Sequence, residues 1–308
     1  MEYFICMDSG GTSTETFALD VDGNILYHLI SGCGSPAASY TYAINNIYNS
    51  IDEIYGYMQK NNNKLMFIEL GISGLGAVEN VKGIEKEFSD KYQAPCEIVT
   101  DAHIALMRIC DLYNVSDAIC LVAGTGNACL GIKNNEFHLT GGGGPLLAEA
   151  GSAYSFTHRL ALRIKDNYEK GLPYTTLQQK CLSYFNCDDF PALKTYFYRH
   201  TKEEVASFTK HGVSLKNDEV NELIKEQAQE LFNQVILQYT YFKFDNKVIL
   251  GLLGGFFHHN DLLVDEIKKL IEINHLNIEL VTKIDKVYLG ALNRAKTLLR
   301  MKKANENK

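Results

Sequence analysis

The chain opens on apolar runs that are separated by short polar turns. Tyr3–Met7 is an apolar run that ends at Asp8, where a Ser-Gly-Gly-Thr turn begins. Two more apolar runs follow, the second after the turn Asp22-Gly-Asn24. Apolar runs broken by glycine and asparagine predict strands joined by hairpins. We therefore expect three antiparallel strands, over residues 3–7, 14–20 and 25–31. A dinucleotide-binding Rossmann start would instead lead from the first strand into a helix.

The next part of the chain alternates between helical and strand-like patterns. From Ala38 to Tyr57 the apolar residues recur at helical spacing, which predicts an amphipathic helix. The patterns after it predict a strand, a helix, a strand and a helix over Leu65–Ile72, Val78–Tyr92, Pro95–Thr100 and Asp101–Leu112.

The first pattern then begins again at Cys120. An apolar run enters a Gly-Thr-Gly turn, a second run leaves it, and the Asn134-Asn135 turn precedes a short third run. This repetition predicts an internal duplication, with two α/β lobes over residues 1–116 and 117–308. The rest is predicted to be largely helical over Ser152–Lys170, Tyr174–Tyr184, Phe190–Lys210, Asp218–Tyr241 and Asn260–Asn274, with strands over Lys247–Leu253 and Asn277–Val281 and a last helix over Val287–Lys303.

Composition and charge narrow the class of protein. The 308 residues are 46% hydrophobic and 22% charged, as in an ordinary globular chain of two domains. A formal net charge of −7 argues against non-specific binding to nucleic acid or to anionic membranes. Apolar stretches stay below the roughly 18 residues of a membrane span, and the N-terminus does not resemble a signal peptide. The eight scattered cysteines lack a C-x-x-C pair, which favours reduced core thiols and a cytoplasmic location.

The glycine turns are the strongest candidates for chemistry. The turn at Gly124-Thr-Gly126 offers backbone N–H groups to an anion, and the turn at Gly10-Gly11 offers the same in the first lobe. A third glycine pair lies in Leu253-Gly-Gly-Phe256. One such turn is common in hairpins, but two at equivalent places in similar lobes indicate a nucleotide clamp.

Five motifs, in order along the chain, carry a resemblance to a known family. They are Asp8-Ser-Gly-Gly-Thr12, Val99-Thr-Asp-Ala102, Ala123-Gly-Thr-Gly-Asn127, Gly141-Gly-Gly-Gly-Pro-Leu-Leu-Ala-Glu-Ala-Gly-Ser-Ala-Tyr154 and Leu253-Gly-Gly-Phe256. The chain resembles the N-acetylglucosamine kinase branch of the BadF/BadG/BcrA/BcrD ATPase family, within the actin–hexokinase–heat-shock-chaperone superfamily. The resemblance implies a two-lobed, actin-like (ribonuclease H-like) fold in which the last helix packs back on the first lobe.

The resemblance also implies roles for individual residues. Asp101 matches the aspartate that accepts the proton of the sugar hydroxyl, and Asp8 lies near the Mg²⁺ ion. ATP would be bound by the three glycine motifs, through Gly10, Gly11, Thr12, Ser13, Gly124, Thr125, Gly126, Gly254 and Gly255. The sugar would be contacted by Asp101 and by Ser35, Asn127, Gly142, Gly143 and Glu149. The resemblance implies ATP and Mg²⁺ as cofactors, a sugar such as N-acetylglucosamine phosphorylated on its 6-hydroxyl, and a homodimer.

The sugar side departs from the family pattern. Gly143 stands where the family has Trp, and Ala148-Glu149-Ala150 stands where it has Gly-Asp-Glu. Ser35 lies near the place of an Asn that contacts the sugar. Kinase chemistry is therefore better supported by the sequence than the identity of the sugar.

Several alternatives stay open at this stage. Asp101 precedes a helix and would also serve as an N-cap, Asp8 as a turn cap, and Glu149 as a helix-entry carboxylate. The altered sugar segment is compatible with a non-catalytic sugar or nucleotide sensor. An ATPase activator of 2-hydroxyacyl-CoA dehydratases would need a cysteine where this chain has Leu121.

Overall fold

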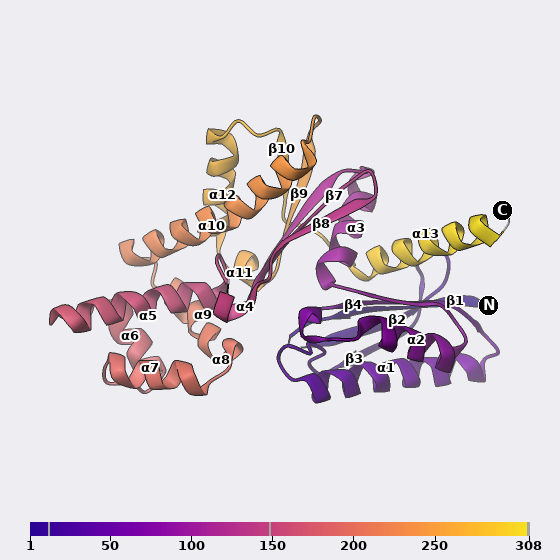
Figure 1. The fold of residues 1–308 in the computed structure, drawn as a ribbon, viewed down its shortest axis with the longest axis horizontal. Helices are drawn as coiled ribbons and strands as arrows, with labels where there is room; N and C mark the ends of the chain where they lie inside the picture. Colours follow the sequence, from indigo (N-terminus) through magenta and orange to yellow (C-terminus); the bar gives the residue numbers. More distant parts are fainter. Residues whose placement is uncertain (12, 148, 307–308) are drawn as a thin grey trace. The chain divides into compact units, whose positions relative to one another are not determined.

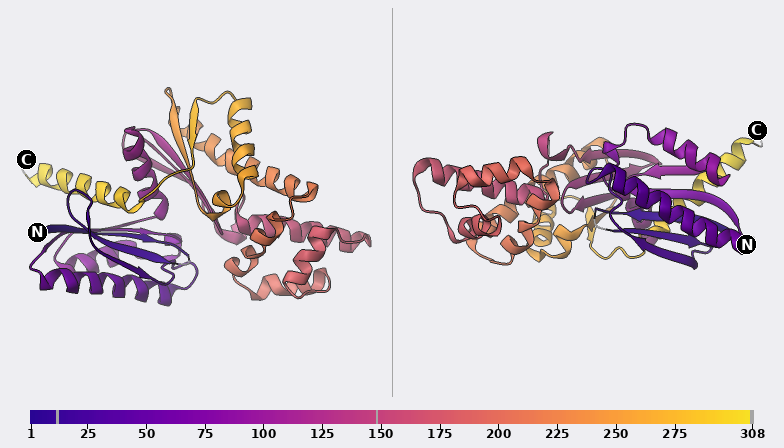
Figure 2. Two further views of the ribbon diagram at one scale, coloured as in Figure 1. Left: turned by 180° about the vertical axis from the view of Figure 1, so that it is seen from behind. Right: turned by 90° about the horizontal axis from the view of Figure 1, so that it is seen from below.

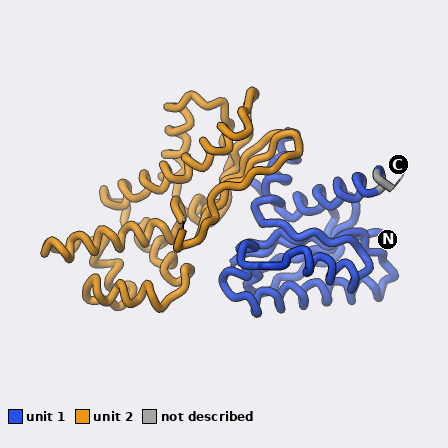
Figure 3. Tube along the Cα trace, viewed as in Figure 1, with its two compact units in different colours: residues 1–116, 283–308 blue, residues 117–282 orange. Residues whose placement is uncertain are grey.

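The computed structural model describes residues 1–11, 13–147 and 149–306. The chain forms two compact units, shown in two colours in Figure 3. Unit 1 comprises residues 1–116 together with 283–308, and unit 2 comprises residues 117–282. The chain therefore leaves unit 1 after Ser116 and returns to it for the last helix.

Unit 1 is built on a five-stranded mixed sheet. Its strands lie in the order β3-β2-β1-β4-β5, where β1–β3 are antiparallel neighbours and β4 and β5 continue parallel to β1. Their bounds are β1 Glu2–Ser9, β2 Thr14–Leu19, β3 Ile25–Ser31, β4 Lys64–Ile72 and β5 Cys96–Val99. Each parallel strand thus ends at the same edge of the sheet as β1.

Helices cover both faces of this sheet (Figures 1 and 2). On one face α1 and α2 pack on the sheet through Ile47, Ile51 and Phe88, which are fully buried. On the other face α3 and α13 bury Ile104 and Ala291 with Phe4, Phe17 and Phe67 of the strands. The helices of unit 1 are α1 Tyr40–Lys60, η1 Leu75–Ala77, α2 Val81–Tyr92, α3 Asp101–Tyr113 and α13 Tyr288–Glu306.

Unit 2 repeats the topology of the first sheet. Its strands lie in the order β10-β9-β6-β7-β8, with β6–β8 antiparallel and with β9 and β10 parallel to β6. Their bounds are β6 Ala118–Ala123, β7 Asn127–Lys133, β8 Glu136–Gly141, β9 Val248–Leu253 and β10 Ile278–Val281. The repeat predicted from the sequence is confirmed, and so is the α/β fold class with a mixed sheet in each half.

The helices of unit 2 form one core with its sheet. Helix α10 packs against β6, β7 and β8, and α5 and α12 pack against α10 (Figure 1). Phe156, Leu231 and Ile267 of these three helices are buried in this core. The helices are α4 Gly144–Leu147, α5 Ala153–Lys170, α6 Thr176–Tyr184, α7 Phe190–Arg199, α8 Lys202–Ala206, α9 Phe208–Val213, α10 Asp218–Phe242, α11 Gly255–His258 and α12 Asp261–Ile273.

One predicted helical stretch is divided in the structure. Residues 190–210 form parts of three helices, because the backbone becomes extended at His200 and a new helix begins after Thr201. The Thr201 hydroxyl accepts from the Glu204 N–H at 3.2 Å, and the Glu204 carboxylate accepts from the Thr201 N–H at 2.7 Å. This reciprocal capping box starts α8 at Lys202.

Six of the eight cysteines are buried, which agrees with their interpretation as small core residues. Within the described ranges, every helix is too short or too polar to cross a lipid bilayer.

Candidate active site

Three polar residues of unit 1, two of them predicted from the sequence, lie at one edge of its sheet. Asp8 lies near the end of β1, Ser73 directly follows β4, and Asp101 follows β5 as the first residue of α3. The Ser73 N–H donates to the Ser9 carbonyl at 2.8 Å, which holds the ends of β1 and β4 together. Because parallel strands end at a common edge, residues that are far apart in sequence become neighbours here.

The Asp101 carboxylate is oriented by its neighbours. It accepts from the Ala102 N–H at 2.9 Å and from the Ser73 side chain. Burial raises the pKa of Asp101, and these hydrogen bonds partly oppose that rise. Ser73 was not among the residues predicted for the site. The position just beyond a parallel strand was the signal that would have found it.

Asp8 is held in an unfavourable environment for a negative charge. Burial, followed by the nearby carboxylates of Asp101 and Glu15, raises its pKa to about 7. The charged side chains that raise the pKa of Asp8 are therefore negative, like Asp8 itself. A cation near Asp8 would relieve this repulsion, so the position suits an electrostatic partner brought by a ligand.

The first glycine turn is fastened to the loop that carries Ser35. The Gly10 N–H donates to the Ser13 carbonyl at 2.9 Å, and the Gly34 N–H donates to the Gly10 carbonyl at 3.1 Å. A side chain at Gly34 would overlap the hydroxyl groups of Ser9 and Thr14, which bond each other at 3.1 Å. Glycine at residue 34 is therefore required for this approach. Thr12 lies outside the described residues.

Ser35 lies beside Gly74, the residue that follows Ser73. It is buried, and a Cβ added at Gly74 would come within 2.5 Å of its hydroxyl and 2.7 Å of the Ala37 Cβ. Gly74 also has a φ of +69°, a conformation that favours glycine. The structure thus brings Ser35 beside the Ser73-Gly74 segment, as expected of residues in one site.

In unit 2 the second glycine turn rests on the start of α5. The Gly124 N–H donates to the Gly126 carbonyl at 2.8 Å. The first N–H groups of α5, from Ala153 and Tyr154, donate to the carbonyls of Gly124 and Thr125 at 2.9 and 3.2 Å. Helix starts leave such N–H groups without partners inside the helix. Here the turn satisfies two of them and is held in place.

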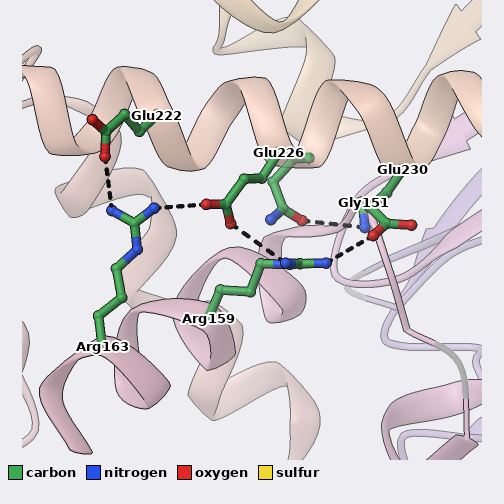
Figure 4. Close-up of polar contacts among 7 residues, drawn as sticks. Gly151, Arg159, Arg163, Glu222, Glu226 and Glu230 are labelled. Carbon is green, nitrogen blue, oxygen red and sulfur yellow. Dashed lines mark hydrogen bonds and ion pairs between the residues drawn. The ribbon is translucent and has the colours of Figure 1, made fainter. Parts of the chain in front are cut away.

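Helix α5 is itself attached to α10 by a row of ion pairs (Figure 4). Arg163 contacts Glu226 at 2.7 Å and Glu222 at 3.4 Å. Arg159 contacts Glu230 at 2.8 Å and Glu226 at 3.4 Å. These contacts fix the helix whose first residues hold the turn.

A buried amide holds the segment that leads into α5. The Gly151 N–H donates to the Gln227 side-chain oxygen of α10 at 3.1 Å. Gly151 has a φ of +76°, and a Cβ there would lie 2.9 Å from a Leu231 methyl group. Gln227 was not predicted, because a glutamine inside a long helix gives no sign of its partner.

The third glycine motif packs directly on the second turn. Parallel pairing of β6 with β9 sets Val122 opposite Leu253, so that Gly254 meets the end of β6. Gly254 has a φ of +101°, and a Cβ there would lie 2.7 Å from the Ala123 carbonyl carbon. Gly255 then begins α11. The predicted phosphate turn and the predicted adenosine motif are therefore direct neighbours.

Glu149 occupies a buried polar position beside the turn. Its side chain is 2% exposed; one oxygen accepts from the Asn127 N–H at 2.9 Å, and the other forms an ion pair with Lys202 of α8. Lys202 was missed by sequence reasoning, since it lies 53 residues away in a segment without a motif.

Asn127, the first residue of β7, lies beside the same turn. Its side-chain N–H donates to the Ala150 carbonyl, while its side-chain oxygen is buried without a partner among the described residues. Gly142 and Gly143 are exposed after β8, and a Cβ at Gly142 would lie 3.6 Å from the Asn127 carbonyl. Asn127, Gly142 and Glu149, three of the predicted sugar residues of unit 2, thus lie close to its second glycine turn. Ala148 lies outside the described residues.

The carboxylates of unit 1 fit the magnesium ion that the resemblance implies. In the described ranges no group of three or more His, Cys, Asp and Glu side chains is arranged to hold a metal by itself. Mg²⁺ is commonly bound by one or two carboxylates together with substrate phosphates and water. Asp8, buried beside Asp101, provides this kind of incomplete site.

Comparisons with solved structures define the class of fold. The chain superposes on a candidate N-acetylglucosamine kinase from Chromobacterium violaceum with a TM-score of 0.71 and 17% identity, covering 95% of this chain and 98% of that one. A ROK family glucokinase from Streptomyces griseus, solved with glucose and AMPPNP, gives 0.59 and 15%, covering 96% and 99%. The fold is therefore one that sugar kinases share.

Comparison of the sequence gives the family. Residues 5–292 match the BadF/BadG/BcrA/BcrD ATPase family, and the chain belongs to it, as its motifs predicted. It is 26% identical over 301 residues to the N-acetylmuramic acid/N-acetylglucosamine kinase of Clostridium acetobutylicum, covering 95% of this chain and 97% of that protein. It is 24% identical over 311 residues to the N-acetyl-D-glucosamine kinase of Dictyostelium discoideum, covering 94% and 96%.

Proposed function

We propose that this protein is an ATP-dependent sugar kinase that phosphorylates the 6-hydroxyl of N-acetylglucosamine or a related amino sugar. The observation that carries the proposal is the position of Asp101, which is buried at the carboxyl end of β5 and held by Ser73 and the Ala102 N–H. Membership of the ATPase family and the names of the curated relatives support it.

Asp101 acts as the general base in this proposal. Its carboxylate accepts the proton of the sugar hydroxyl as that oxygen attacks the terminal phosphorus of ATP. The bond between this phosphorus and the oxygen that bridges it to the rest of the nucleotide breaks, and ADP leaves. Burial raises the pKa of Asp101, and a base whose pKa is nearer the working pH removes a proton more effectively. The hydrogen bonds from Ser73 and Ala102 aim the carboxylate.

The nucleotide is assigned to the glycine motifs and to Asp8. Backbone N–H groups around Gly10, Gly11, Thr12 and Ser13 and around Gly124, Thr125 and Gly126 would contact phosphate oxygens. Gly254 and Gly255 would lie on the adenosine side. Asp8 would help to hold Mg²⁺, which supplies neutralisation of the phosphate charge when it is bound.

The sugar is assigned to Ser35 in unit 1 and to Asn127, Gly142, Gly143 and Glu149 in unit 2. The unpartnered oxygen of Asn127 supports this assignment, because a buried acceptor is costly unless a ligand donates to it. A cytoplasmic location and a homodimer stay predictions.

The test is a coupled assay of ADP release at saturating MgATP against a panel of sugars. The panel contains N-acetylglucosamine, glucosamine, N-acetylmannosamine, glucose and N-acetylmuramic acid. We expect a rate on one or more amino sugars, and we expect Asp101→Asn to lower kcat by about 10²- to 10⁴-fold. The matched control is Asp90→Asn, which removes an exposed carboxylate of the same unit and should change nothing.

The proposal fails if no sugar of the panel stimulates ADP release while ATP still binds. That result would favour a sugar or nucleotide sensor, which the altered segment around Glu149 also allows. The role of Asp101 fails separately if Asp101→Asn retains activity within about tenfold of wild type, since a general base contributes more than that.

A further inference from the structure

The glycine motifs of this chain contain no positive side chain. Asp8–Thr14, Gly124–Asn127 and Leu253–Phe256 hold neither Lys nor Arg, so these segments offer a polyphosphate only N–H and hydroxyl groups. Phosphate sites commonly add a Lys or Arg, because an ammonium or guanidinium group makes strong, charge-assisted bonds to phosphate oxygens. A cation at either turn must therefore come from elsewhere in the chain.

Such a cation lies at the second turn. The Lys202 ammonium is next to Gly126, where an added Cβ would overlap it, and the same Cβ would lie 2.9 and 3.3 Å from the Glu149 oxygens. Gly126 thus allows the turn backbone to approach both charges. The Lys202 side chain is 22% exposed, whereas its partner Glu149 is 2% exposed. The ammonium is therefore the accessible half of the pair.

The Lys202 ammonium has more N–H donors than its contact with Glu149 uses. It carries three N–H groups, and its partner in the structure is one oxygen of Glu149. The other Glu149 oxygen is occupied by the Asn127 N–H, which fixes the carboxylate to the start of β7. The Thr201–Glu204 capping box fixes the helix that carries Lys202. Both ends of the pair are held rigidly beside the turn.

We propose that Lys202 is a phosphate-binding residue of the second glycine turn, supplied by the helical segment of unit 2, and that Glu149 is the residue that positions it. This inference rests on the proposed function, since it assigns the phosphates of ATP to that turn. It leaves Glu149 free to accept a sugar hydroxyl as well, because a carboxylate has lone pairs beyond those used here.

Phosphate binding by Lys202 must be distinguished from a purely structural role, the neutralisation of Glu149. Lys202 would also be needed if it only neutralised Glu149, because an unpaired charge in a buried position is strongly destabilising. Lys202→Met alone does not separate the two roles. The double variant Lys202→Met/Glu149→Gln does, because it removes the cation and the buried charge together and keeps an oxygen for the Asn127 N–H.

The experiment measures binding of ATP, ADP and AMP with Mg²⁺, and of N-acetylglucosamine and N-acetylmuramic acid, by titration calorimetry, after circular dichroism has shown that each variant is folded. We expect the double variant to bind ATP and ADP about 10- to 100-fold more weakly, as for loss of a charge-assisted bond, with AMP affinity unchanged. Lys165→Met is the matched control, because Lys165 pairs with Glu169 on the outer side of α5 at 2.8 Å.

Three results would overturn the proposal. Wild-type ATP affinity in the double variant would show that Lys202 only neutralises Glu149. Unchanged ATP binding with lost binding of N-acetylmuramic acid, but not of N-acetylglucosamine, would assign Lys202 to a sugar carboxylate. Absence of ATP binding by the wild-type protein would overturn the proposed function and this inference together, whereas the first two results leave the kinase proposal intact.

Discussion

The two units place a carboxylate beside the same kind of glycine turn in opposite electrostatic settings. In unit 1, Asp8 is buried near two other carboxylates, and its pKa rises to about 7. In unit 2, the Glu149 side chain is 2% exposed, yet it is paired with Lys202 and bonded to a backbone N–H. Both sheets have the same strand order and pairing. The difference therefore arises from what surrounds each duplicated turn and not from the fold.

This difference indicates how one repeated arrangement of strands could be used for two tasks. A carboxylate left among like charges favours a ligand that brings a cation, such as magnesium with ATP. A carboxylate already paired with lysine contributes no net charge and instead fixes the position of an ammonium. In the proposed function, unit 1 would therefore supply the general base and the metal-binding carboxylate, and unit 2 would add a positive charge for the phosphates.

The largest effect on stability should come from breaking the pair of unit 2. We expect Glu149→Gln to lower the free energy of unfolding by about 3 kcal/mol, because it leaves Lys202 without its partner at a mostly buried site. Urea unfolding followed by circular dichroism measures the change. Glu169→Gln, which breaks the exposed pair with Lys165, is the control. Equal losses of unfolding free energy in the two variants would show that burial does not strengthen the Glu149–Lys202 pair.

The corresponding change in unit 1 should have the opposite sign. Asp8→Asn removes a repelled charge, so at pH 8 we expect it to raise the free energy of unfolding by about 2 kcal/mol. Because the folded-state pKa of Asp8 is raised, the contribution of Asp8 to the stability of the wild-type protein declines as pH rises from about 4 to about 7 and is constant above that.

The gain from Asp8→Asn should accordingly disappear near pH 4, where folded Asp8 is protonated. Urea titrations at both pH values measure this difference. A stability gain that is the same at both pH values, or a loss of stability at pH 8, would show that charge repulsion does not control the effect of Asp8 on stability.

The smallest effect should come from the exposed ion pairs of α5 with α10 (Figure 4). Arg163 is 28% exposed and its partners more so. We expect Arg163→Met to lower the free energy of unfolding by less than about 1 kcal/mol, because solvent and salt screen such pairs. The same urea assay applies. A loss as large as that of Glu149→Gln would mean that the number of pairs, and not burial, sets their strength.

Much of the fold follows from the sequence because its signals are local. Apolar runs separated by Asn and Gly predicted the hairpins of both sheets, and helical periodicity predicted α1, α5 and α10 to within a few residues. The break at His200 was missed, since an apolar pattern on each side conceals the capping box at Thr201. Short helices such as α4 and α11 leave too few residues for a period to be seen.

The candidate site was predictable only where residues lie in motifs. Asp8, Asp101 and the glycine turns follow from strand ends and from the family resemblance. Ser73, Lys202 and Gln227 do not, because each acts across a tertiary contact: to Asp101, to Glu149 and to Gly151. Their sequence neighbours carry no sign of these partners.

The return of the chain to unit 1 has a consequence for its synthesis. Ala291, Leu292 and Ala295 of α13 are buried with Phe4, Phe17 and Phe67, and Gly290 approaches the backbone of α3 too closely for a Cβ. While the ribosome is still translating residues 117–282, one face of the first sheet lacks this cover. All residues of unit 2 are synthesised before α13, the last element of unit 1. Unit 2 should therefore complete its folding before unit 1 does.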